Sequence, residues 1–217
     1  IPSEKNISRG VGKTAFYLPV NEVQCITESE DKRSIAVGTS HGCYLIDKQN
    51  PMHPRRFFFP GQYPDKDINL FVNSMVYQNS SHVWIGTDGG GLYDYDLTTN
   101  KFRNYTTQES LPSNVVYGII NGKNGKLWLS TDKGLAFIYH GKVVNLNFFK
   151  GLEREYNRMS VACTSDGRML FGSNDGVVAL APTFAKGLNY AAPLRIHRVE
   201  VEGVERTDQW NETLFEM

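Results

Sequence analysis

Residues Val83 to Asp96 read VWIGTDGGGLYDYD, an apolar run that ends in a glycine-rich turn and continues as alternating aromatic and acidic residues. Similar runs recur along the chain, and their turn glycines are separated by 49, 43 and 42 residues. The aligned glycines are Gly42, Gly91, Gly134 and Gly176. A sequence period of roughly 40 to 50 residues is typical of β-propeller repeats. The stretch is therefore expected to be one copy of a repeated unit rather than a phosphate-binding loop, which would lead into a helix.

Each copy also has a recurrent environment. An asparagine followed by a short apolar stretch precedes it, and the four asparagines are Asn21, Asn73, Asn114 and Asn157. A polar turn such as 121–125 connects that stretch to the glycine motif, which predicts a hairpin. Further alternating stretches follow, for example 92–95 and 101–105. Four antiparallel strands in about 42 residues predict a propeller blade.

The predicted fold class is all-β, with about four four-stranded antiparallel blades that form part of a larger ring. The expected repeats are 21–70, 71–110, 111–152 and 153–182, within a propeller region at 1–182. Residues 13–20 are expected to be the last strand of an earlier blade, or alternatively the outer strand of the fourth blade in a small closed ring.

Composition excludes several other classes. Lys and Arg total 23, as do Asp and Glu, and no basic stripe is present, so nucleic acid is not expected as a partner. No window approaches the roughly 18 consecutive apolar residues of a membrane span. The cysteines Cys25, Cys43 and Cys163 form no CxxC pair. Buried free thiols are expected, and one disulfide with an odd thiol is the alternative.

The repeats resemble the two-component regulator propeller repeats in the periplasmic sensor regions of hybrid two-component systems from Bacteroides-type bacteria. Residues 111–120, LPSNVVYGII, with 126–135, KLWLSTDKGL, carry this resemblance most clearly, and 83–95 is nearly as close. The resemblance covers about 20–182. It weakens at both ends, where Ala36, and Leu170 or Phe171, stand in place of the tryptophan of the pattern.

The resemblance implies that residues 183–217 form a linker and the beginning of an immunoglobulin-like β-sandwich. It further implies a periplasmic domain of an inner-membrane histidine kinase that recognises oligosaccharides released from glycans. Contact with the membrane would come only through segments outside this chain. Catalytic residues, a metal site and a cofactor are not expected within it.

A candidate ligand surface follows from strand order. The second strand of a blade returns antiparallel to the first, so the asparagines that precede the first strands share a face with the turns around the glycines. Sugars are bound by planar polar side chains and aromatic rings. The predicted ligand residues are Arg158, Asn114, Asn157, Asp88, Asp132 and Lys133. Arg158 is the first choice because no other repeat has a cation directly after its asparagine, although turn-capping roles are the alternative for the Asx residues.

Two other functions stay open at this point. A propeller-type polysaccharide or lactone lyase would need a histidine or a metal for proton abstraction, whereas the five histidines are scattered without ligand spacing. A non-catalytic scaffold would bind another protein, or a second copy as a homodimer, through an exposed blade edge. Trp84 and Trp128 occupy equivalent positions in two repeats and are expected in the core between blades.

Overall fold

The computed structural model describes residues 22–51, 53–58, 71–122 and 125–186, and the backbone of 200–201 and 204–205. Its contacts divide the chain into two units, Ile1–Phe184 and Ala185–Met217. In the second unit, β16 (Glu200–Val201) pairs antiparallel with β17 (Val204–Glu205). The rest of the predicted sandwich segment, and the predicted strand at 13–20, lie outside the described residues.

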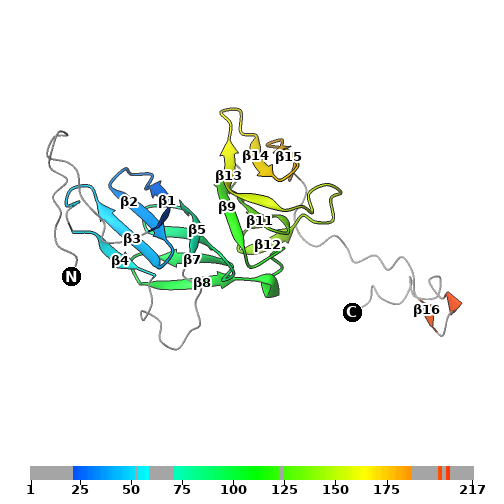
Figure 1. Ribbon diagram of the computed structural model, residues 1–217, viewed down its shortest axis with the longest axis horizontal. Coiled ribbons are helices and arrows are strands. Elements are labelled where there is room, and N and C mark those ends of the chain that lie inside the picture. The colour runs from blue at the N-terminus through cyan, green and yellow to red at the C-terminus, as the bar shows by residue number, and fades with distance from the viewer. Residues whose placement is uncertain are drawn as a thin grey trace. The chain divides into compact units, whose positions relative to one another are not determined.

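Four antiparallel sheets make up the described part of the first unit, and in each of them the strand order follows the sequence (Figure 1). We call them blade 1 (β1–β4), blade 2 (β5–β8), blade 3 (β9–β12) and blade 4 (β13–β15). The predicted all-β propeller class is confirmed, with the difference that blade 4 has three strands among the described residues. The elements are β1 (Val23–Glu28), β2 (Ser34–Thr39), β3 (Gly42–Asp47), β4 (Arg55–Phe57), β5 (Val72–Tyr77), β6 (His82–Thr87), β7 (Leu92–Asp96), β8 (Lys101–Tyr105), the 3-10 turn η1 (Thr107–Glu109), β9 (Val116–Asn121), β10 (Leu127–Thr131), β11 (Gly134–Tyr139), β12 (Lys142–Asn145), β13 (Tyr156–Cys163), β14 (Met169–Ser173) and β15 (Gly176–Leu180).

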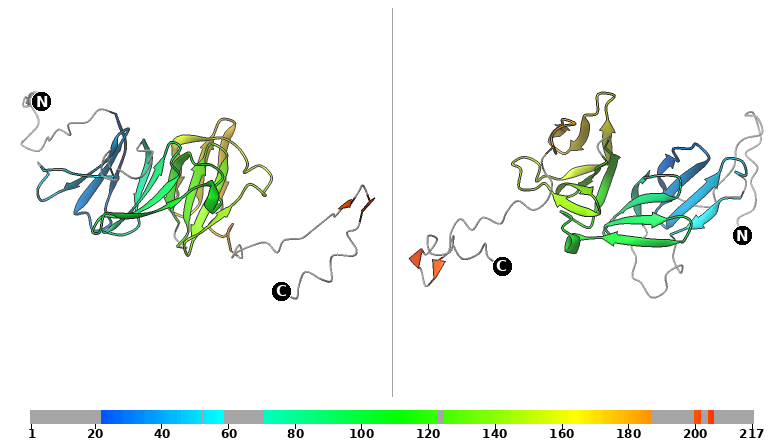
Figure 2. Two further views of the ribbon diagram at one scale, coloured as in Figure 1. Left: turned by 90° about the horizontal axis from the view of Figure 1, so that it is seen from below. Right: turned by 180° about the vertical axis from the view of Figure 1, so that it is seen from behind.

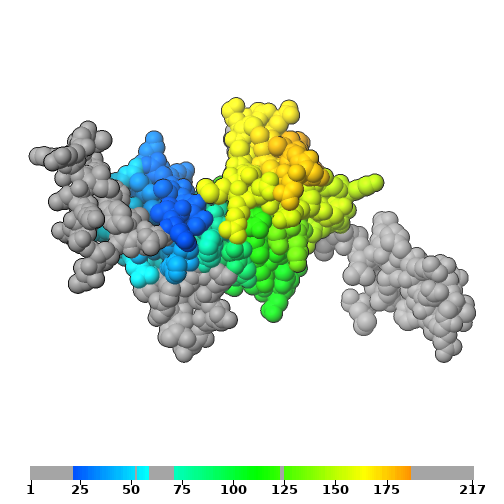
Figure 3. Space-filling view, viewed as in Figure 1, coloured from blue at the N-terminus to red at the C-terminus, as the bar shows by residue number. Residues whose placement is uncertain are grey.

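The first strand of each blade is the innermost strand of the arrangement. Strand β1 lies beside β5, β5 beside β9, and β9 beside β13. In Figure 1 and in both views of Figure 2, the sheets of blades 1 and 4 lie apart, with the green sheets of blades 2 and 3 between them. The described blades therefore form an open arc, and the space-filling view shows the same order of colours from blue through green to yellow (Figure 3).

A threonine or serine hydroxyl holds the turn that gives the repeat its pattern. In blade 2 the Thr87 hydroxyl donates to the carbonyl oxygen of Gly91 at 2.8 Å. Thr39, Thr131 and Ser173 make the same bond to Gly42, Gly134 and Gly176, at 2.8, 2.9 and 3.0 Å. All four glycines have positive φ angles, which other residues rarely adopt. The recurring threonine or serine and the recurring glycine are therefore the donor and acceptor of one hydrogen bond that holds the turn.

A second recurring glycine, which precedes the turn, leaves room for the next blade. A Cβ atom added to Gly38 would lie 2.6 Å from Cγ1 of Val72, and one added to Gly86 would lie 2.8 Å from Cγ1 of Val116. Each valine belongs to the inner strand of the following blade. Absence of a side chain on these glycines thus lets successive sheets approach closely.

Blade 3 achieves the same packing with the two residues exchanged. Ser130 stands where the other blades have glycine, and its partner across the ladder is Gly118. Here Gly118 provides the hollow, and Val161 of blade 4 lies against it. In blade 2 the corresponding cross-strand pair is Ser74 and Gly86. One member of each pair must be glycine, whichever strand supplies it.

The predicted equivalence of Asn73 and Asn114 is wrong. Val72 pairs with Thr87, and Val116 pairs with Thr131, so Asn73 corresponds to Tyr117 rather than to Asn114. Asn73 occupies the bulge that interrupts the inner strand and is buried, whereas Asn114 precedes its strand. The inner strand of blade 3 has its bulge at the matching position, between Val116 and Gly118, and there the extra residue is Tyr117 rather than an asparagine.

Replacing Gly86 by alanine should destabilise the fold. The new Cβ would lie 2.7 Å from the Ser74 hydroxyl and 2.8 Å from Val116, and overpacking of this kind costs about 1–3 kcal/mol. Urea denaturation measures the loss. Lys101→Ala, on the exposed outer strand β8, is the control and should change stability by less than about 0.5 kcal/mol. Equal stability of the two variants would contradict the packing role of Gly86.

Candidate functional site

Arg158, the first predicted ligand residue, lies in an enlarged bulge of β13. Tyr156 pairs with Ser173 and Val161 with Phe171, so residues 157–160 are accommodated opposite a single position of β14. The Arg158 guanidinium lies 2.6 Å from the Asp88 carboxylate of blade 2. Its central carbon also lies 5.3 Å from the ring centres of both Phe71 and Tyr117.

This arrangement means that Arg158 connects three blades. The bulge extends the side chain from blade 4 past Tyr117 of blade 3 to Asp88 and Phe71 of blade 2. The side chains of Arg158 and Asp88 are 45% and 32% exposed, so solvent screens the pair and limits its contribution to stability. The structure therefore brings two of the predicted ligand residues together as an interblade ion pair.

The turn around Asp88 is longer than the equivalent turns of the other blades, and hydrogen bonds join it to blade 3. The Gly89 and Gly91 amides donate to the Asn114 carbonyl oxygen at 3.1 and 2.7 Å, and Asp88 forms an isolated bridge with Val115. The Asn114 side chain accepts a hydrogen bond from the Thr107 amide at 2.8 Å, which holds η1. Asp88 and Asn114 thus help to hold this turn against blade 3.

The remaining predicted residues are more loosely placed. Asn157 is half-buried beside Arg158 in the bulge, and Lys133 is exposed. The Lys133 carbonyl oxygen accepts from the Asn147 side chain at 2.7 Å. Asp132 is half-buried, and its Oδ1 has no hydrogen-bond partner among the described residues. The structure does not bring Asp132 and Lys133 into the contact between Arg158 and Asp88.

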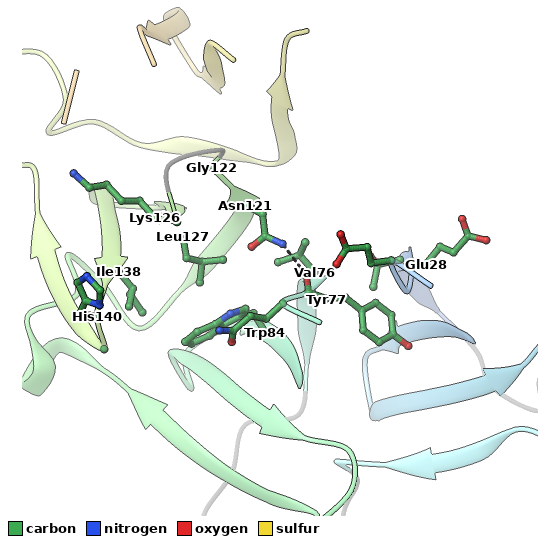
Figure 4. A pocket seen from close by; sticks show the side chains of 15 residues that line it. Glu28, Val76, Tyr77, Trp84, Asn121, Gly122, Lys126, Leu127, Ile138 and His140 are labelled. Carbon is green, nitrogen blue, oxygen red and sulfur yellow. Dashed lines mark hydrogen bonds between the residues drawn. The ribbon is translucent and has the colours of Figure 1, made fainter. Parts of the chain in front are cut away.

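A pocket of about 690 Å³ lies at the opposite ends of the inner strands. Blade 2 contributes Val76 and Trp84, and blade 3 contributes Leu127 and Ile138. Figure 4 shows Trp84 at the base, with Leu127 above it and Ile138 to one side. The volume falls in the range of ordinary small-molecule sites, about 300–1,000 Å³. Apolar side chains from two blades therefore form the floor of this pocket.

Polar groups surround that floor. The Asn121 side-chain amide donates to the Tyr77 carbonyl oxygen at 2.6 Å and so connects blades 2 and 3 at the pocket wall (Figure 4). Blade 1 supplies Glu28, which forms an ion pair with Lys48, and Glu30. The described lining also includes Gln78 and His140, among other residues.

Lys126 is a lining residue with a different environment. The residue is 6% exposed, and its ammonium lies 4.7 and 5.1 Å from the ring centres of Phe137 and Tyr139. Burial lowers the pKa of Lys126. Figure 4 shows the side chain directed away from the pocket base, so it packs on its own blade rather than reaching towards Trp84.

None of the six predicted ligand residues lines this pocket. They lie where the inner strands begin, whereas Tyr77 and Asn121 lie where β5 and β9 end. Trp84 was predicted to lie in the core between blades, which agrees with its 6% exposure and with its place in one buried cluster with Val116 and Ile119. The cavity at the rim of the same interface was not predicted from the sequence.

Within the described residues, no group of three or more His, Cys, Asp or Glu side chains is placed to hold a metal ion. His82 forms a pair with Asp94 at 3.3 Å, and neither residue belongs to the described lining of the pocket. No helix in the described part of the chain is long and apolar enough to cross a membrane.

Comparison with known proteins agrees with the repeat. Residues 110–133 match the family model described as "Two component regulator propeller". A protein named histidine kinase P4 from Formosa agariphila is 33% identical over 81 residues, which is 34% of this chain and 6% of that relative. The predicted resemblance to two-component regulator propeller repeats is confirmed.

Solved structures share the fold. The extracellular domain of a hybrid two-component system from B. thetaiotaomicron superposes with a TM-score of 0.63 at 20% identity, over 76% of this chain and 21% of its own. Virginiamycin B lyase from Staphylococcus aureus superposes with a TM-score of 0.55 at 15% identity, over 76% of this chain and 57% of its own. At these identities the likeness concerns the fold alone. The present chain spans about a fifth of that extracellular domain.

The ion pair between Arg158 and Asp88 should contribute little to stability. A double-mutant cycle with Asp88→Asn and Arg158→Gln is expected to give a coupling free energy of about 0.2–1 kcal/mol, because both side chains are partly exposed. Urea denaturation at low and high salt measures it, and high salt should reduce the coupling. A coupling that salt leaves unchanged would contradict this assignment.

Proposed function

We propose that this chain is an extracytoplasmic sensing segment of a hybrid two-component histidine kinase, located in the periplasm, and that it binds a glycan-derived oligosaccharide. The observation that carries the proposal is the pocket at the ends of β5 and β9, whose lining includes both Trp84 and Asn121. The repeat shared with two-component regulator propellers supports the sensing role. Kinase activity itself would belong to other parts of such a protein.

The chemistry of the pocket suits a sugar. A sugar ring has an apolar face that packs on aromatic and aliphatic side chains, and hydroxyls that pair with planar polar groups. Trp84, Leu127 and Ile138 supply the first kind of surface. Asn121 and Gln78 supply amides of the second kind. The lining contains both acidic and basic side chains, so a ligand of strong single charge is not favoured.

The position of the pocket also suits signal relay. Its lining comes from blades 1, 2 and 3, so a ligand seated there contacts several sheets at once. A ligand shifts a conformational equilibrium only by the difference between its affinities for the two states. Contacts distributed over three blades would make the binding free energy sensitive to their relative arrangement, and a small rearrangement could then pass along the chain.

Binding should be lost when the pocket is altered. We expect oligosaccharides screened by calorimetry and thermal shift to stabilise the chain without turnover. Asn121→Ala and His140→Ala should weaken binding of the responding sugar at least tenfold, or about 1.4 kcal/mol. Lys133→Ala and Asn157→Ala, on the opposite face, serve as matched controls and should bind normally.

The other outcomes separate the alternatives. If the control variants lose binding while the pocket variants keep it, the ligand occupies the face around Arg158. Product formation would identify a propeller lyase instead of a sensor. Absence of any sugar response, together with a dimer in light scattering, would favour a scaffold that binds a second copy.

A further inference from the structure

Two sulfur atoms lie at the hollow of Gly38, between blades 1 and 2, and a third lies beside one of them. The Sγ of Cys25 and the Sδ of Met75 lie 2.6 and 2.9 Å from the point that a Cβ at Gly38 would occupy. The Cys43 thiol lies 3.8 Å from the Met75 thioether sulfur. All three residues are buried, with exposures of 8% for Cys25, 0% for Cys43 and 8% for Met75.

The repeat provides an internal standard for this cluster. Strand pairing identifies the equivalent positions in the other blades. Cys25 and Cys43 are the cross-strand partners of Gly38, as Ser74 and Leu92 are the cross-strand partners of Gly86. In the interfaces that follow, the three positions hold Ser74, Leu92 and Ile119, and then Gly118, Leu135 and Val161. Ordinary small and aliphatic side chains therefore satisfy the packing, and sulfur occupies all three positions at one interface among the described blades.

The two thiols cannot be explained as a disulfide. Cys25 and Cys43 pair with Gly38 from opposite sides, so two strand spacings separate them. That distance is roughly 9–10 Å between Cα atoms, whereas a disulfide needs less than about 7 Å. Both cysteines are free. Burial raises the pKa of Cys25 to about 12 and holds that of Cys43 well above its usual value, so both are neutral thiols.

We propose that Cys25, Cys43 and Met75 form a binding site for a soft monovalent cation, Cu(I) in the first place. Thiolate and thioether sulfur are the ligands that select Cu(I) over harder ions. One thiol loses its proton to solvent as the copper–sulfur bond forms, and the oxidation state of the metal does not change. A Cu⁺ ion with one thiolate is electrically neutral, which suits an apolar interior. The cation would join blade 1 to blade 2 at the Gly38 hollow.

Cu(I) titration against a chromophoric chelator, under anaerobic conditions, tests the site. The reference chain is Cys163→Ser, because Cys163 is exposed and would bind metal by itself. It should bind one equivalent of Cu(I), with sulfur-to-copper absorption in the ultraviolet and a rise in melting temperature. Ag(I), a soft cation of the same charge that needs no reductant to stay monovalent, should give the same stoichiometry in the absence of reductant.

Substitutions taken from the next interface keep the packing while they remove sulfur. We introduce three substitutions one at a time into the reference chain: Cys25→Ser, Cys43→Leu and Met75→Ile. Each should weaken Cu(I) binding by at least roughly 10- to 100-fold, which is the loss of affinity seen when a metal site loses an outer-shell partner. Circular dichroism of the metal-free variants checks that they fold, and Met75→Ile, which leaves both thiols in place, is the mildest of them. Unchanged affinity in the folded variants, or a reference chain that binds no Cu(I), would overturn the proposal.

Discussion

Close approach of successive sheets requires a position without a side chain, and the described structure depends on that constraint. Gly38 and Gly86 meet it on the second strand of their blades, and Gly118 meets it on the first strand of blade 3. A valine of the following blade fills each hollow. Dispersion contacts are lost quickly when surfaces separate, so a gap of one methyl group between sheets would remove much of the packing energy.

The two faces of the arc, where the inner strands begin and where they end, differ in what their polar groups do. At the beginnings of the inner strands, the turn around Asp88 is bonded to Asn114, and Arg158 reaches across from blade 4. At the other ends, the interface between blades 2 and 3 opens into the pocket over Trp84. Polar groups at the first face join blades to one another, whereas Asn121 both joins blades 2 and 3 and lines the pocket.

One interface departs from the repeat in its chemistry rather than in its shape. Between blades 1 and 2, sulfur replaces the small and aliphatic side chains found at the equivalent positions elsewhere. Cys25 and Cys43 are separated by 18 residues in the chain, and Met75 lies further on, so no local sequence motif indicates that these three residues form a cluster. Only pairing of β1, β2 and β3, followed by packing of β5, places these atoms together.

The sequence by itself determined the repeat, the antiparallel blades and the resemblance to two-component regulator propellers, because turn glycines and apolar alternation are local properties of the chain. It identified Trp84 as a core residue and grouped Asp88 with Arg158 on one face. Tertiary structure alone decided that these two form an ion pair, that Asn73 belongs to a bulge, and that the pocket lies at the opposite ends of the strands. Bulges shift register without a sequence signal, and a cavity depends on how the rims of separate sheets meet.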